Sequence, residues 1–248
     1  IGAFWCAAPA LVEGNTVVIK PSEDAPLSTE LAVKAYVEAG IPPGVLNLIH
    51  GDGEVGDELA KHPEVDHICF TGSAEVGQHI RRVCADSWNK TCSCELGSKS
   101  AVIVFDDANF DLAVSASIAS AFKLSGQRCV SAGRLIVQRG IYDKFCESFT
   151  KYASQVVAGQ PFDEQATEAK DSSNFFAFGE GKSSFVSPVA NSLAYMGPLI
   201  NKQQLERVKR FNQLVIEDYM AEVLVAPTYK GPGNYVSPMV YKTEWRDA

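Results

Sequence analysis

The chain has 248 residues, of which 46% are hydrophobic and 21% charged, so its composition is that of a globular protein with a large buried core. Its formal net charge of −8 argues against a nucleic-acid-binding surface, which normally carries a basic patch. The absence of any run of about 20 apolar residues argues against a membrane span.

The chain begins at Ile1 without an initiator Met or a basic signal-peptide region, so we expect its start to be cut from a longer protein. Its cysteines are odd in number and irregularly spaced, and Cys92 and Cys94 are too close together for the usual zinc pair. We therefore expect no metal site, and reduced thiols, most of them small core residues, in a cytoplasmic protein. The seven cysteines are Cys6, Cys69, Cys84, Cys92, Cys94, Cys129 and Cys146.

The first half of the chain alternates short β-branched strands with helices. Gly14 is typical of a helix end, and Pro21 ends the strand that follows. Ser28 is predicted to cap the next helix, which Gly40 and two prolines close. The predicted strands are 16–20, 45–49, 67–70 and 90–95, and the predicted helices span about 28–38, 53–61 and 75–85.

The alternation continues in the second half and predicts right-handed βαβ units in a parallel sheet with helices on its faces. Between about 159 and 195 the pattern is lost in a stretch rich in Ser, Phe, Gly and Ala, so we predict an inserted surface loop around 164–195. The other predicted elements are strands at 101–105, 134–137 and about 235–240, helices at 112–124, 142–157 and 202–217, and turns at 125–129 and 230–234.

Cys129 is a candidate nucleophile because it follows a glycine-containing turn between a predicted helix and a predicted strand. A thiol at such a boundary can be exposed and close to backbone N–H groups, which favour a thiolate and can hold a developing oxyanion. The alternative for a single cysteine is a packing role.

Glu95 is a candidate base because it ends a predicted strand, just before Gly97 turns the chain. Ligands of parallel sheets lie beyond the carboxyl ends of the strands, and a partly buried carboxylate there can act as a base. The alternative is a solvated loop acid.

Two other turns are candidates for holding a dinucleotide. The turn 70–77 follows a strand and opens a helix, which is the place where backbone N–H groups bind phosphates. Its glycines, Gly72 and Gly77, depart from the G-x-G-x-x-G pattern, so a plain structural turn is the alternative. Lys20 and Glu23 follow another strand and could hold ribose hydroxyls, or form an ordinary surface turn.

Together these segments resemble the aldehyde dehydrogenase superfamily in both order and spacing. The resemblance implies an α/β fold, with a partial Rossmann-like NAD(P)-binding domain with a parallel sheet at 1–97 and a partial α/β catalytic domain at 98–248. The matching segments are 9–23, 42–47, 70–77, 95–97 and 126–129, followed by 160–163 and 197–200.

The resemblance also implies the activity: oxidation of an aldehyde to a carboxylic acid with NAD(P)+, the EC 1.2.1 class. Cys129 corresponds to the nucleophile that forms the thiohemiacetal and the thioester. Glu95 corresponds to the base that activates water to hydrolyse it. The partners implied are a small-molecule aldehyde and a second copy of the chain, in a homodimer or homotetramer.

The same resemblance assigns residues to the cofactor. Lys20 and Glu23 resemble the ribose-binding pair, and the turn with Ser73 resembles the pyrophosphate site. Since a carboxylate at 23 repels a 2′-phosphate, NAD is favoured and NADP is the alternative. The predicted cofactor residues are Lys20, Ser22, Glu23, Gly53, Phe70, Thr71, Gly72, Ser73, Val76, Gly77, Leu96 and Gly97.

The sequence also departs from the family pattern. The family's second oxyanion donor, an Asn, would precede Ile1, and its Glu-x-Phe-Gly-Pro motif would follow the last residue, so we expect a poorly active piece of a longer protein. Ser98 stands where the family usually has Gly, and Leu124 where it often has Asn.

Two other functions stay open at this point. The first is a truncated, non-catalytic relative that serves as a binding or structural protein, against which the presence of both Cys129 and Glu95 argues. The second is the branch of the family that transfers the acyl group to coenzyme A. That branch tends to lack the base, so Glu95 argues against it as well.

Overall fold

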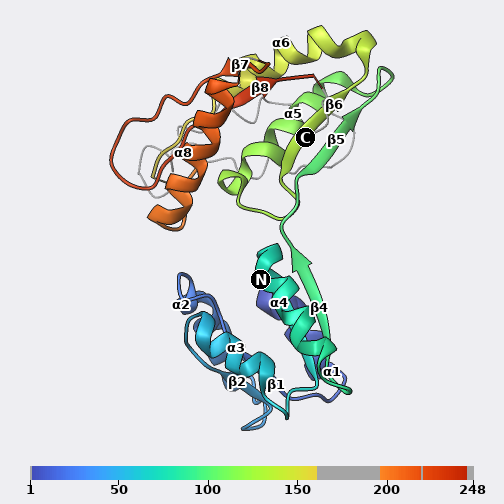
Figure 1. Cartoon of the computed structure of the whole chain (residues 1–248), viewed down its shortest axis with the longest axis vertical. Helices are drawn as coiled ribbons and strands as arrows, with labels where there is room; N and C mark the ends of the chain where they lie inside the picture. The colour runs from blue at the N-terminus through green and yellow to red at the C-terminus, as the bar shows by residue number, and fades with distance from the viewer. Residues whose placement is uncertain (1, 161–195, 219, 245–248) are drawn as a thin grey trace. The chain divides into compact units, whose positions relative to one another are not determined.

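The computed structural model describes residues 2–160, 196–218 and 220–244 (Figure 1). The chain divides into two compact units, Ile1–Gly97 and Ser98–Ala248, and each is described by itself. The loop predicted around 164–195 lies outside the described residues. No helix in the described part of the chain is long and apolar enough to cross a membrane.

The first unit is α/β and contains two pairs of parallel strands, β1 with β2 and β3 with β4. A helix lies between the two strands of each pair in the sequence, as the predicted βαβ units require. Its elements are α1 (Gly2–Val12), β1 (Val17–Ile19), α2 (Pro26–Glu38), β2 (Leu46–Leu48), α3 (Gly53–Lys61), β3 (His67–Gly72), α4 (Ala74–Ala85) and β4 (Thr91–Leu96).

Side-chain caps explain where α3 and α4 begin. Asp52 accepts a hydrogen bond from the N–H of Glu54 at 3.0 Å, and Ser73 accepts one from the N–H of Val76 at 3.3 Å. The predicted cap at Ser28 is wrong, because α2 begins two residues earlier at Pro26. Proline favours the first position of a helix, since its φ is already helical and its missing N–H has no partner to lose there.

The second unit contains a parallel pair, β5 with β6, and an antiparallel pair, β7 with β8. Its elements are β5 (Ser100–Val104), α5 (Phe110–Phe122), a 3₁₀ turn (Lys123–Gly126), β6 (Ala132–Val137), a second 3₁₀ turn (Arg139–Ile141), α6 (Tyr142–Ala153), α8 (Lys202–Glu217), β7 (Glu222–Val225) and β8 (Val240–Lys242).

Two predicted elements of this unit have wrong bounds, and one strand was not predicted. The helix predicted to residue 157 ends at Ala153, because the chain then becomes extended and Ala158 pairs with Met196 in a parallel bridge. The last strand was expected at 235–240 but lies at 240–242. Pro238 has no N–H to give a strand ladder, and Ser237 uses its hydroxyl to accept the N–H of Tyr229 at 2.7 Å. The strand β7 was not predicted.

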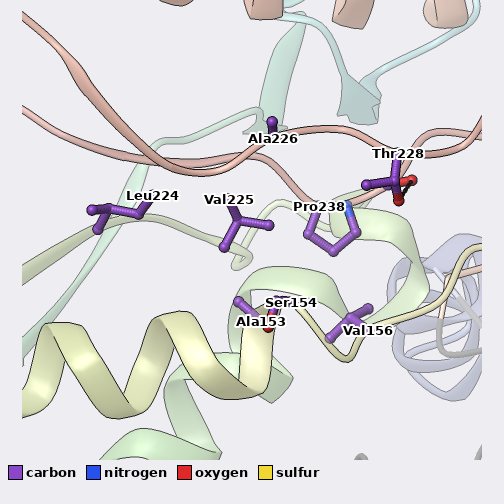
Figure 2. Close-up of a pocket in the computed structure, with 9 residues that line it drawn as sticks. Ala153, Ser154, Val156, Leu224, Val225, Ala226, Thr228 and Pro238 are labelled. Atoms are coloured by element: carbon purple, nitrogen blue, oxygen red, sulfur yellow. Dashed lines mark hydrogen bonds between the residues drawn. The ribbon is translucent and has the colours of Figure 1, made fainter.

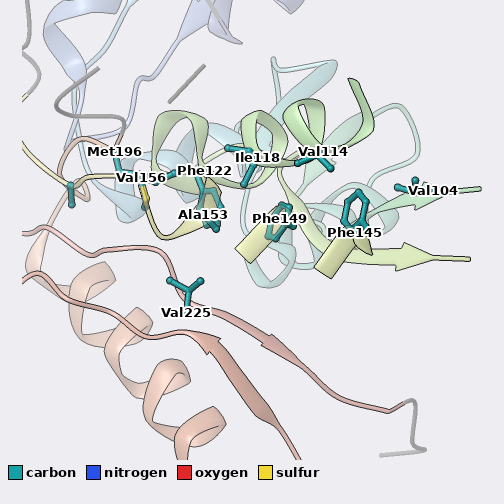
Figure 3. Packing of buried hydrophobic residues seen from close by; sticks show 11 residues of the cluster. Val104, Val114, Ile118, Phe122, Phe145, Phe149, Ala153, Val156, Met196 and Val225 are labelled. Carbon is teal, nitrogen blue, oxygen red and sulfur yellow. The ribbon is translucent and has the colours of Figure 1, made fainter. Parts of the chain in front are cut away.

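The core of the second unit forms mainly between α5 and α6 (Figure 3). Ile118 of α5 and Phe145 of α6 are each 1% exposed, so both side chains are almost completely removed from water. The rings of Phe145 and Phe149 stack with their centroids 6.0 Å apart. This packing fixes the carboxyl end of α5, from which the turn that precedes Cys129 begins.

The expectation that most cysteines are core residues is wrong. All seven are free thiols within the described residues, and Cys84 is the buried one. Cys69 and Cys129 are exposed, while the other four are half-buried. Cys69 lies on β3 and Cys129 follows the turn after α5, so the two exposed thiols belong to different units.

Candidate active site

Cys129 lies in the second unit, three residues after a tight 3₁₀ turn, and its side chain is exposed. The turn contains three successive residues with positive φ: Leu124 (55°), Ser125 (58°) and Gly126 (69°). For residues other than glycine this left-handed conformation costs about 1–2 kcal/mol each. The backbone is thus strained just before the predicted nucleophile. Strained backbone of this kind is often found at functional sites.

Arg128 fixes the end of this turn to α5. Its Nη2 lies 3.4 Å from both the carbonyl oxygen of Ala119 and that of Ser120. These carbonyls belong to the last turn of α5, where they attract a cation. The residue before Cys129 is therefore held by a helix end, although no role was predicted for it.

The strain at Leu124 leads to a stability prediction. Leu124 is 61% exposed, so its side chain contributes little burial, while asparagine tolerates left-handed φ well. Leu124→Asn should raise the free energy of unfolding by about 0.5–1 kcal/mol, measured by urea denaturation. The matched control is Leu214→Asn on α8, where the leucine is 50% exposed but helical, and where asparagine should destabilise. Equal losses in both variants would contradict the assigned strain.

The surroundings of three cysteines in the first unit favour the unreactive thiol form. Burial, together with a hydrogen bond to Cys6, raises the pKa of the Cys69 thiol to about 11. Burial is also the main cause that raises the pKa values of Cys92 and Cys94. A thiolate is the nucleophilic form, so none of these three is a good candidate for attack on a carbonyl at neutral pH.

Glu95 is the last residue but one of β4, and its side chain is exposed. Its partner in the parallel ladder is Thr71, and the next pair is Gly72 with Leu96. Glu95 alternates with Leu96, which contacts α4, so its carboxylate lies on the face of the strand turned away from α4. The register therefore places the carboxylate at the carboxyl edge of the β3–β4 pair.

The turn between β3 and α4 lies at the same edge. Ser73 caps the helix, and Thr71, Gly72 and Val76 are exposed around it. Gly77 is buried against β4, where a Cβ would lie 2.4 Å from Cδ2 of Leu96. The carbonyl oxygen of Gly77 also accepts a hydrogen bond from the Cys94 thiol at 3.8 Å. Glycine at 77 thus allows the first turn of α4 to pack tightly on β4.

This close approach predicts the effect of adding one methyl group. Gly77→Ala should lower the free energy of unfolding by about 1 kcal/mol, because the flexible side chain of Leu96 has to move away from the new Cβ. The control is Gly53→Ala at the start of α3, where a Cβ meets nothing within 4 Å and stability should stay constant or rise. Urea denaturation of both variants measures the difference. If Gly77→Ala is as stable as Gly53→Ala, Leu96 does not require a glycine opposite it.

The Lys20 ammonium spans the carboxyl ends of β1 and β2. Its Nζ donates to the carbonyl oxygens of Pro21 and Gly51, each at 2.8 Å. Ser22 accepts a hydrogen bond from the N–H of Asp24 at 3.3 Å, and Glu23 is exposed. Gly53 begins α3 just beyond this contact.

A hydrogen bond joins α3 to α4 within the first unit. His79 Nε2 lies 2.6 Å from Oδ1 of Asp57, and Lys61 lies 2.6 Å from the other oxygen of that carboxylate. The hydrogen bonds from Lys61 and His79 hold the pKa of Asp57 below its usual value. No role was predicted for these residues, which connect the helix after Lys20 with the helix after Ser73.

The structure thus brings together some of the predicted site residues and leaves others apart. Thr71–Ser73, Glu95 and Leu96 meet at one edge through the β3–β4 register, and Lys20 reaches the turn before Gly53. Phe70 is half-buried on β3, and Gly97 ends the first unit. Glu95 and Cys129 belong to different units, so a common cleft between them stays a prediction.

The described residues also form a cavity of about 280 Å³ in the second unit (Figure 2). It lies between the end of α6, at Ser154 and Val156, and the segment from Leu224 to Pro238. None of the predicted site residues lines it. Nor does any cluster of three His, Cys, Asp or Glu side chains suited to a metal ion occur within the described ranges.

Known proteins match nearly the whole chain. A model of the "Aldehyde dehydrogenase family" matches residues 2–247. The chain is 39% identical over 206 residues to succinate-semialdehyde dehydrogenase, mitochondrial, of Arabidopsis thaliana, which is 83% of this chain and 34% of that protein. It is 42% identical over 161 residues to betaine aldehyde dehydrogenase of Vibrio vulnificus, 64% of this chain and 32% of that protein. The chain spans about a third of the length of these curated relatives.

Solved structures give a similar result. Gamma-glutamyl-gamma-aminobutyraldehyde dehydrogenase from Burkholderia cenocepacia matches with a TM-score of 0.80 and 33% identity, over 98% of this chain and 44% of that one. Betaine aldehyde dehydrogenase from Staphylococcus aureus, in complex with NAD+, matches with a TM-score of 0.78 and 30% identity, over 96% of this chain and 43% of that one.

Proposed function

The chain belongs to the aldehyde dehydrogenase family, and from this membership we propose that the protein oxidises an aldehyde to a carboxylic acid with NAD(P)+. We assign residues 1–97 to its NAD(P)-binding domain and 98–248 to its catalytic domain, the same ranges as the two compact units. The observation on which the proposal rests is Cys129, an exposed thiol that follows a strained turn fixed to the end of α5.

The proposed reaction has two stages on the sulfur of Cys129. The thiolate attacks the aldehyde carbon, and the oxygen becomes the oxyanion of a thiohemiacetal. Bound NAD(P)+ supplies the oxidant of this reaction by accepting a hydride. Cys129 then carries the acyl group as a thioester. Glu95 removes a proton from water, the resulting hydroxide attacks the thioester carbon, and the acid leaves as the C–S bond breaks.

The residues of the first unit suit a dinucleotide. An ammonium has three N–H donors, and Lys20 uses two of them on Pro21 and Gly51, which leaves one for a ribose hydroxyl. Ser73 and the first turn of α4 offer a helix N-terminus to the pyrophosphate, with Gly77 allowing α4 to lie close to β4. The exposed carboxylate of Glu23 favours NAD, because it would repel the 2′-phosphate of NADP.

The decisive experiment is an assay of the protein at its natural length. NADH absorbance is followed with a panel of aldehydes that includes succinic semialdehyde and betaine aldehyde, the substrates named in two relatives. We expect NADH to form at a rate that depends on the aldehyde, together with one equivalent of acid. A protein that binds NAD but produces no NADH with any aldehyde would favour a non-catalytic binding role instead.

We also propose that the protein works in the cytoplasm as a homodimer or homotetramer. The family supports the oligomer, and the free thiols of the chain suit the cytoplasm. One curated relative is named as mitochondrial, so the compartment is best tested by fractionation of cells that express the natural protein.

A further inference from the structure

A short segment far from Cys129 in the sequence, residues 196–200, is firmly fixed in the second unit. Met196 and Leu199 are each 5% exposed. The N–H of Met196 donates to Val157 at 3.0 Å, and the N–H of Leu199 donates to Asn234 at 2.7 Å. Two buried side chains and hydrogen bonds at both ends therefore hold the segment in place. Groups that bind to this segment are held in place with it.

The turn before Cys129 binds the polar backbone groups of this segment. Ser125 Oγ donates to the carbonyl oxygen of Gly197 at 2.8 Å. The Gln127 amide uses both of its ends: Oε1 accepts the N–H of Ile200 at 3.3 Å, and Nε2 lies 3.5 Å from the carbonyl oxygen of Pro198. These three contacts join residues about 70 positions apart, so they fix the turn in three dimensions rather than locally.

Gln127 also contacts the strained part of the turn itself. Its Nε2 donates to the carbonyl oxygen of Leu124 at 3.3 Å, and its backbone N–H donates to the same oxygen at 3.1 Å. The residue is exposed, so burial does not account for its place. A single amide thus connects Leu124, which has φ of 55°, to the fixed segment 196–200, two residues before the thiol.

We propose that Gln127 is a positioning residue that holds the turn 124–128, and with it the Cys129 thiol, against the fixed segment 196–200. The catalytic consequence of this inference rests on the proposed function. The hydrogen bonds between the turn 124–128 and the segment 196–200, here called the joint, do not depend on that function. Ser125 supports the same joint through Gly197. In the absence of the Gln127 amide the turn can leave its strained conformation, and the thiol then loses its defined position.

The test replaces Gln127 with methionine, which has a similar length but neither the donor nor the acceptor, in the protein at its natural length. The matched control is Gln213→Met on α8, whose Nε2 donates to Glu217 at 2.9 Å on the helix surface. Two readouts are needed. Hydrogen exchange by mass spectrometry follows the peptides 123–131 and 197–201. Steady-state kinetics give the KM for NAD and the kcat per Cys129 thiol of folded protein, with the folded fraction measured by circular dichroism.

We expect Gln127→Met to speed exchange about ten-fold in both peptides together, and to lower kcat per thiol by about 10- to 100-fold with an unchanged KM for NAD. Loss of folded protein alone would lower the folded fraction and leave kcat per thiol of folded protein constant. Gln213→Met should change neither readout.

If hydrogen exchange is faster only in the peptide 123–131 and unchanged in 197–201, the joint does not exist. Faster exchange in both peptides with normal kcat per thiol would overturn the positioning role. If the unsubstituted protein oxidises no aldehyde, the proposed function fails, and the exchange result still decides whether the joint exists.

Discussion

Cys129→Ala is expected to lower NADH formation from an aldehyde by at least about 10⁴-fold in the protein at its natural length. Alanine cannot form the C–S bond of the thiohemiacetal, so both stages of the proposed reaction are lost together, as they are when a nucleophile is removed from other covalent enzymes. Cys129 is exposed and its side chain contributes little to packing, so the variant should fold normally. Initial rates of NADH absorbance and a thermal unfolding curve measure the two properties.

The matched control for this variant is Cys69→Ala. Cys69 is the other cysteine whose side chain reaches the surface, but partial burial of its sulfur and its hydrogen bond to Cys6 raise the pKa of the thiol to about 11. It is therefore protonated at neutral pH, and its removal should leave the rate within about two-fold. Loss of activity in Cys69→Ala with retention in Cys129→Ala would reverse the assignment of the nucleophile.

The sequence predicted the fold where a local pattern determines the structure. The starts of α3 and α4 were predicted within one residue, and the structure shows that Asp52 and Ser73 cap them through backbone N–H groups two or three residues ahead. These two caps were not predicted, and the one that was, at Ser28, is wrong. The four strands of the first unit were all predicted, because each lies next to a turn residue in the strand–helix alternation and β1 is also a β-branched run. The strand β7 was missed, since its four residues are paired with β8, which follows only after an irregular segment.

The candidate site also has features that follow from local pattern and features that depend on tertiary packing. Thr71 and Glu95 could be expected at one edge, because parallel strands bring their carboxyl ends together. The joint between Gln127 and Ile200 could not be predicted, because it depends on tertiary packing that places two distant segments side by side. The left-handed φ of Leu124 could not be predicted from the sequence either, since leucine has no preference for that conformation. The one available signal was the expected departure from the family pattern at this position, a Leu in place of Asn.

Glu95→Gln should separate the two stages of the proposed reaction. The amide has nearly the shape of the carboxylate but cannot take a proton from water, so thioester hydrolysis should slow by about 10²–10⁴-fold. Formation of the thioester needs Cys129 and does not need the base. A rapid mixing experiment should therefore show a burst of one NADH per active site followed by a slow steady rate, whereas Glu58→Gln, an exposed acid on α3, should turn over normally.

The trapped intermediate offers a chemical proof of the role of Glu95. Hydroxylamine attacks thioesters without the help of a base, so its addition should restore turnover of Glu95→Gln and yield the hydroxamate in place of the acid. Mass spectrometry of the stalled protein should find the acyl group on the peptide that contains Cys129. If Glu95→Gln shows no burst of NADH, Glu95 is needed at or before the oxidation step. If its steady rate is unchanged, another group activates water. In either case the carboxylate at the edge of β4 would not be the base for hydrolysis.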